Sequence, residues 1–129
     1  MLTYVGKGYN PAFTDNYDSV VARLVAGEDI VIEEGTDDIC RPLLATSEPH
    51  CLRDSVIERD TKAMYDVAHL LGRPLHVGGA INLDAMTLAK FRGAFAKGQT
   101  RRACMGCEWF DLCSAVSKAG YQDARLKFA

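Results

Sequence analysis

The stretch RDSVIERDTKAMYDVAHLL, residues 53–71, has the clearest periodic pattern in the chain and decides the fold class. Its apolar side chains recur every three or four residues, so they share one face of an amphipathic helix. The members of this face are Val56, Ile57, Met64, Val67, Ala68 and Leu71. Gly72 and Pro74 follow directly, and this combination is typical of a helix end. We therefore predict a long helix from about Arg53 to Leu71.

One further helix is predicted on each side of this stretch. The earlier one begins at Asn10-Pro11, where Asn is a good cap and Pro fits the first turn, and it stops before Gly27. The later one is capped by Asn82 or Asp84 and reaches about Ala96. Its apolar side is expected to consist of Met86, Leu88, Phe91 and Phe95.

Strand signals are few and short. Asp29–Glu34 contains three consecutive β-branched residues and predicts one strand, and Leu75–Val77 predicts a second. We expect a mostly α fold with minor β structure: one small domain of about three main helices over residues 1–129. Its remaining parts are an N-terminal lead-in over 1–9, a cysteine-rich segment over 103–113 and a polar, partly helical tail over 114–129.

Composition limits the function more than it defines it. The 129 residues suit a single core, and 15 basic against 17 acidic residues leave a net charge of −2. That balance favours neither nucleic acid nor a membrane surface as a partner, and no apolar run approaches a membrane span. Five cysteines cannot all pair within one chain. Because no signal peptide precedes them, we expect a reducing, cytoplasmic location, where clustered cysteines more often bind metal or act in redox chemistry.

The strongest chemical signal is the segment CMGCEWFDLC, residues 104–113. Cys104 and Cys107 are separated by two residues, so both sulfurs can turn toward one metal, and Gly106 gives the backbone freedom for that turn. Cys113 lies six residues further on, a rise of about 9 Å in a straight helix. We therefore expect the segment to curl so that Cys113 approaches the other two.

A four-ligand site needs one more donor than this segment offers. Cys51 or Cys40 is the expected fourth ligand, with Cys51 preferred, and His50 is an alternative ligand of the kind found in Cys₃His zinc sites. We expect an iron–sulfur cluster of the 4Fe–4S type, or alternatively zinc. An unknown redox partner is then implied.

Charged and aromatic neighbours of these cysteines are candidate supporting residues. Guanidinium groups favour deprotonated thiols and negatively charged clusters, and Trp109 can screen the site from water or simply pack in the core. The arginines in question are Arg41, Arg53, Arg101 and Arg102.

Three functional classes remain open from the residues. The first is an iron–sulfur protein for electron transfer or redox sensing, and the second is a structural zinc module. The third is an enzyme that uses a reactive thiol or a cluster, for which Cys51 beside His50 is the sequence hint. A thioredoxin-like pair is disfavoured because no strand precedes Cys104, and ordinary buried cysteines are the plainest alternative.

Several ordered motifs together resemble a known family. They are Gly6–Phe13 (GKGYNPAF), Asp37–Cys40 (DDIC), His50-Cys51, Arg59-Asp60 and Cys104–Phe110 (CMGCEWF) followed by Cys113. Over nearly the whole chain, this order is similar to the bacterial and archaeal domain of unknown function 1284. The resemblance implies a candidate iron–sulfur binding protein with no established reaction.

Two departures from the family pattern affect the ligand supply. Members usually carry an Arg-x-His-His-x-x-Cys segment before the Gly-Lys-Gly-Tyr run, and this chain begins at Met1 without it. We therefore expect the natural protein to start further upstream. Many members also have a cysteine where this chain has Leu43. Five cysteines still suffice for one four-ligand site.

Overall fold

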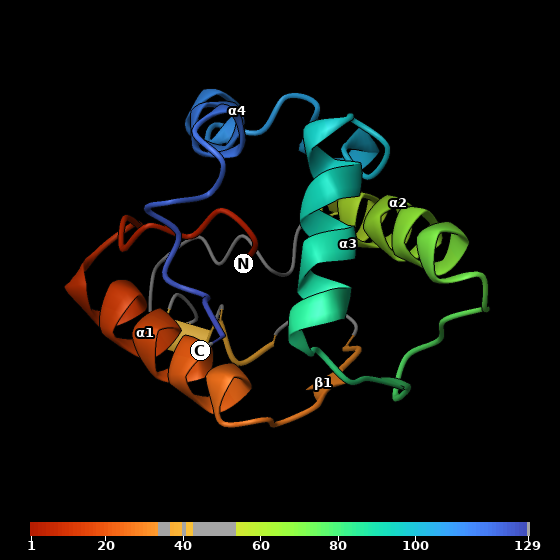
Figure 1. The fold of residues 1–129 in the computed structure, drawn as a ribbon, viewed down its shortest axis with the longest axis horizontal. Coiled ribbons are helices and arrows are strands. Elements are labelled where there is room, and N and C mark those ends of the chain that lie inside the picture. The colour runs from red at the N-terminus through yellow and green to blue at the C-terminus, as the bar shows by residue number, and fades with distance from the viewer. Residues whose placement is uncertain (34–36, 40, 43–53, 129) are drawn as a thin grey trace.

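The fold is described by a computed structural model over residues 1–33, 37–39, 41–42 and 54–128 (Figure 1). Within these ranges it is a small, mostly α-helical single domain, as the sequence predicts. In chain order, its elements are α1 (Pro11–Val25), β1 (Ile30–Val31), α2 (Asp54–Leu71), β2 (Ala80–Ile81), α3 (Ala85–Ala96), the 3₁₀ turn η3 (Arg102–Cys104) and α4 (Phe110–Lys118). None of the described helices is long and apolar enough to cross a membrane.

The first helix forms as its sequence predicts. The Asn10 side chain accepts a hydrogen bond from the backbone N–H of Phe13 at 2.8 Å, which satisfies one of the donors left open at a helix start. Pro11 occupies the first turn, and Gly27 ends the helix with a φ of +100°. The buried face consists of Phe13, Tyr17, Val21 and Leu24.

The two strands pair antiparallel, with Ile30 opposite Ile81 and Val31 opposite Ala80. The predicted strand over Leu75–Val77 is wrong, because the second strand begins at Ala80 instead. A tight turn in which the Gly79 N–H donates to the His76 carbonyl at 2.9 Å occupies this part of the chain. The chain therefore reverses before it can pair.

The third helix resolves the choice between two caps and corrects one core assignment. The Asp84 carboxylate accepts from the Thr87 N–H at 2.7 Å, whereas Asn82 donates to Asp29. Leu88 and its predicted aromatic neighbours are buried, but Met86 is 82% exposed. Two residues turn a helix by about 200°, so Met86 lies opposite Leu88 and cannot share its face.

The N-terminal lead-in and the C-terminal segment both belong to the core. The ring of Tyr4 stacks on that of Tyr17, with centroids 3.8 Å apart and planes within 2°. Leu126, in the segment expected to be a polar tail, is fully buried. Figure 1 shows this C-terminal segment, in blue, running from α4 toward α1. The core is therefore closed by both ends of the described chain.

A few hydrogen bonds join these end segments to each other and to α3. The Arg125 N–H donates to the Tyr4 carbonyl at 2.8 Å. The Arg92 guanidinium donates to the carbonyls of Leu2 and Leu126 at 3.0 and 2.9 Å. Further along, η3 packs on α2 and α4 packs on α3. The cysteine-rich segment is thereby held by α2 and α3 on one side and by the N-terminal lead-in on the other.

Candidate functional site

The three cysteines of residues 104–113 lie on a turn that joins η3 to α4. Cys104 is the last residue of η3, Cys107 lies in the turn and Cys113 lies in the first half of α4. All three are free and half-buried. The Cys107 N–H donates to the Cys104 carbonyl at 3.0 Å, and Gly106 has a φ of +77°, a conformation that side chains disfavour. Glycine therefore permits the tight turn between the first two thiols.

The donor chemistry of this segment fits a thiolate-ligated group. Free sulfur ligands suit iron–sulfur clusters and zinc. Among the described residues, however, no three His, Cys, Asp or Glu side chains are gathered closely enough to hold a metal ion. The other predicted ligands, Cys40, Cys51 and His50, lie outside the described residues. The described side chains therefore supply suitable donors without forming a complete site by themselves.

Two of the thiols affect the titration of the Met1 α-amino group. Burial lowers the pKa of the Met1 α-amino group to about 6, while the Cys113 and Cys104 side chains act on that pKa in the opposite sense. Both thiols therefore lie within electrostatic reach of one buried group.

The N-terminal lead-in shelters the cysteine segment through two side chains that the sequence did not single out. The buried hydroxyl of Thr3 donates to the sulfur of Cys113 at 3.1 Å. At the other end, the Trp109 indole N–H donates to the Tyr9 hydroxyl at 3.2 Å, and the two rings meet edge to face with centroids 5.6 Å apart. Burial raises the pKa of Tyr9, as do the nearby Glu108 and Cys107 side chains. Tyr9 therefore lies beside the cysteine-rich turn.

The arginines predicted to support the thiols have other partners in the structure. Arg101 is sandwiched between the rings of Phe95 and Phe110, 4.4 and 4.2 Å from their centroids, and donates to the Ser114 hydroxyl. Arg102 donates from Nε to the Asp66 carboxylate at 2.8 Å. Both arginines thus anchor the segment that carries the cysteines.

A different arginine lies beside the cysteine-rich turn. A Cβ at Gly106 would lie 3.5 Å from the Nη2 atom of Arg59, so this guanidinium of α2 approaches the backbone between Cys104 and Cys107. By contrast, Arg41 pairs with Asp38 at 2.8 Å. Arg53 lies outside the described residues. The positive charge beside the cysteine-rich turn therefore comes from Arg59, and not from the described arginines that lie nearer to the cysteines in the sequence.

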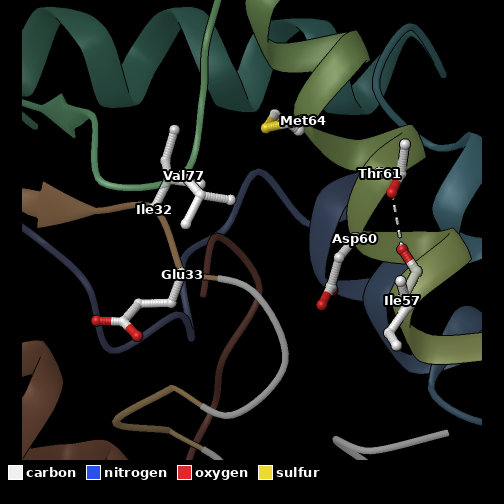
Figure 2. Close-up of a pocket in the computed structure, with 7 residues that line it drawn as sticks. All are labelled: Ile32, Glu33, Ile57, Asp60, Thr61, Met64 and Val77. Atoms are coloured by element: carbon white, nitrogen blue, oxygen red, sulfur yellow. Dashed lines mark hydrogen bonds between the residues drawn. The ribbon is translucent and has the colours of Figure 1, made fainter.

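A separate pocket of about 190 Å³ lies between α2 and the loops beside the strands. Figure 2 shows the lining residues of α2 on one side and those of the loops on the other. The pocket is lined by Ile32, Glu33, Ile57, Asp60, Thr61, Met64 and Val77. Burial raises the pKa of Asp60, and the carboxylate of Asp37 adds to the effect. Among the described residues, no cysteine or histidine lines this pocket, and none of its lining residues belongs to the segment 104–113.

The fold and the site together define a class of protein: a small helical domain whose cysteine-bearing turn is covered by its own N-terminal lead-in. The chain belongs to the family described as protein of unknown function (DUF1284), whose model matches residues 8–113. This match confirms the family resemblance drawn from the motifs, and it ends at Cys113. The comparisons with curated proteins and with solved structures found no match.

Proposed function

We propose that this protein binds an iron–sulfur cluster through Cys104, Cys107 and Cys113, with Cys51 or Cys40 as the fourth ligand. The biological role would be electron transfer or redox sensing in the reducing cytoplasm. A cluster held in this way would supply single-electron chemistry. The chain's own residues would supply the thiolates, their orientation and their shelter from water.

The observation that carries the proposal is the state and placement of three thiols. They are free, half-buried and spaced along ten residues that turn at Gly106. A disulfide would remove two donors, and complete burial in apolar surroundings would leave the thiols inert. Partial burial beside a turn supports ligation, because the sulfurs stay reachable by an incoming metal or cluster.

The surroundings also support a redox group over a purely structural metal. Hydrogen bonds to ligand sulfurs and the exclusion of solvent set the potential of a cluster. Thr3 already donates to Cys113, and Tyr9 accepts a hydrogen bond from Trp109 between Cys107 and Cys113. The guanidinium of Arg59 adds positive charge beside the turn. These groups would stabilise the negative charge of a thiolate-ligated cluster.

The test is metal analysis of the full chain prepared without oxygen. We expect iron and acid-labile sulfide in stoichiometric amounts, with the visible absorbance of a thiolate-ligated cluster. Serine replacement of Cys104, Cys107 or Cys113 should abolish both. Serine replacement of Cys51 and of Cys40, made separately, should abolish cluster binding in one variant and leave it in the other, which serves as the matched control.

Two results would overturn the proposal. Stoichiometric zinc without iron would identify a structural zinc module, in which a chelator unfolds the domain without a colour change. Metal-free protein whose cluster cannot be reconstituted under reducing conditions would remove the metal altogether.

A further inference from the structure

An open basin of about 680 Å³ lies where the C-terminal half of α2 meets η3. Tyr65, Asp66, His69 and Ala68 line it from the helix, Gly72, Arg73 and Pro74 from the helix end, and Gln99 and Arg102 from the chain leading into and within η3. None of the described residues that line the basin is a cysteine, and its proposed ligand does not depend on the proposed cluster.

A buried carboxylate with an unused acceptor forms one wall of the basin. Asp66 is 9% exposed, and its Oδ1 atom accepts from Arg102 Nε at 2.8 Å. Its Oδ2 atom is buried and has no hydrogen-bond partner in the part of the chain that the structure describes. A carboxylate oxygen kept from water without a donor costs free energy. The site therefore favours a ligand that brings a hydrogen-bond donor to this atom.

The same ion pair positions a guanidinium for an anion. Asp66 holds Arg102 through Nε, so this bond uses neither Nη group, and the Arg102 side chain is 61% exposed. A guanidinium fixed in this way presents paired donors that match the oxygens of a phosphate or carboxylate. Buried Asp66 thus turns an ordinary surface arginine into an oriented one.

Further donors line the same basin. Arg73 donates from its Nη2 to the Ala80 carbonyl at 3.2 Å, which uses one of its donors, and His69 and Gln99 also line the basin. The carbonyl of Ala68, at the negative end of α2, already accepts from the N–H groups of Gly72 and Arg73. That capping reduces the negative field that an anion would otherwise meet.

We propose that this basin binds a small hydroxylated phosphate ester. Two guanidiniums, Arg102 and Arg73, would hold the phosphate dianion, and a ligand hydroxyl would donate to the open oxygen of Asp66. The two guanidiniums outweigh the single carboxylate of Asp66, so the basin still attracts an anion, and it attracts a dianionic phosphate more than a single carboxylate. The hydroxyl distinguishes an ester from free phosphate, since an ester carries its hydroxyl on a carbon chain away from the phosphate oxygens, whereas the P–OH of hydrogen phosphate is bound to the same phosphorus as those oxygens.

The experiment titrates the isotope-labelled full chain with glycerol 3-phosphate, inorganic phosphate and glycerol, followed by amide chemical shifts. We expect saturable binding of glycerol 3-phosphate, weaker binding of inorganic phosphate and no binding of glycerol. The shifted amides should be those around Asp66, Gly72, Gln99 and Arg102. No saturable binding of glycerol 3-phosphate in the millimolar range would overturn the proposal.

Variants separate recognition from folding. Arg73→Gln removes one anion contact while losing only a surface bond to a carbonyl, and it should weaken binding of glycerol 3-phosphate by roughly tenfold. Arg102→Gln should do the same, and its amide spectrum shows whether η3 stays folded. The matched control is Arg125→Gln, which removes an exposed arginine outside the basin.

Two further outcomes are decisive. Unchanged affinity in Arg73→Gln and in folded Arg102→Gln would place the ligand elsewhere. Equal affinity for inorganic phosphate and glycerol 3-phosphate would overturn the role of Asp66 as a hydroxyl acceptor.

Discussion

Single side chains of the N-terminal lead-in connect the two ends of the chain. Thr3 and Cys113 are 110 positions apart, yet one hydrogen bond joins them. Tyr4, the next residue, stacks on Tyr17 and donates its hydroxyl to Asp18 at 2.8 Å. Two adjacent residues therefore have different roles: Thr3 contacts a thiol, and Tyr4 packs against α1.

The hydroxyl of Thr3 is expected to tune the sulfur of Cys113. In Thr3→Val the shape is kept and the donor is lost, so the Cys113 thiolate loses a stabilising hydrogen bond. We expect slower alkylation of Cys113 in metal-free protein, measured by mass spectrometry against Cys107 as an internal reference. In cluster-loaded protein, the reduction potential should become more negative.

Thr3→Ser is the matched control for this prediction, because it keeps the hydroxyl. Its alkylation rate and potential should stay close to those of the natural sequence. If Thr3→Val alkylates at the natural rate, the hydrogen bond has no effect on the sulfur.

We predict that ionisation of the Tyr4 phenol lowers the stability of the protein at alkaline pH. Burial raises its pKa from 10.0 to about 12, and the hydrogen bond to Asp18 adds to the shift. A raised pKa means that folding favours the neutral phenol. The stability it contributes is complete below pH 10 and is lost as the pH rises toward 12, by up to about 2–3 kcal/mol.

Urea unfolding across that pH window checks the Tyr4 prediction. Tyr4→Phe keeps the stacked ring and removes the titrating group, so its free energy of unfolding should fall less steeply with pH. Parallel pH dependences of the two proteins would show that Tyr4 does not titrate differently on folding.

At the scale of elements, local signals decide where the helices begin. Asn10 caps α1 and Asp84 caps α3, each by accepting a backbone N–H three residues ahead. The caps are local, and for that reason the sequence pattern predicts them well. Hydrogen bonding to Thr87 lowers the pKa of Asp84, so its contribution to stability is present above pH 3.8 and is lost as the pH falls below that value.

Removal of the first cap should cost a measurable part of the stability. Asn10→Ala leaves the Phe13 N–H without its side-chain acceptor, and we expect a loss of about 1 kcal/mol in the free energy of unfolding. Asn10→Asp keeps an acceptor oxygen at the cap and should lose far less. Equal losses in the two variants would show that capping is not the cause. Chemical denaturation followed by circular dichroism measures both.

At the scale of the whole molecule, Arg92 joins three segments. Its guanidinium bonds the carbonyls of Leu2 and Leu126 and lies 4.9 Å from the centroid of the Tyr121 ring. The Tyr121 hydroxyl in turn donates to the Arg92 carbonyl at 2.7 Å. One residue of α3 therefore fastens both end segments to the core.

Arg92→Met should loosen this closure. The substitution keeps much of the side-chain volume but leaves two part-buried carbonyls without donors, and we expect a loss of about 1–3 kcal/mol in the free energy of unfolding. Lys90→Met, an exposed site on the same helix, is the matched control and should change little. Amide hydrogen exchange should quicken in residues 1–5 of Arg92→Met and not in the control. Unchanged exchange there would contradict the role of Arg92.

The features that the sequence predicts correctly are those that depend on residues close together in the chain. Helices α1, α2 and α3 follow from periodicity and capping, which act over a few residues. The error at Met86 came from grouping apolar residues without following the helical rotation to Leu88. The misplaced second strand came from apolar character alone, since the turn from His76 to Gly79 takes up that part of the chain.

For the candidate site, the sequence by itself determined the donors and the family: three thiols in ten residues, with a glycine to turn between two of them. Only the tertiary structure decided what surrounds them, with Thr3 on Cys113, Tyr9 on Trp109 and Arg59 beside the turn. The physical reason is that spacing within a segment is local, whereas these contacts join residues far apart in the chain. Such contacts depend on how α2, α3 and both end segments pack, and no local pattern encodes that packing.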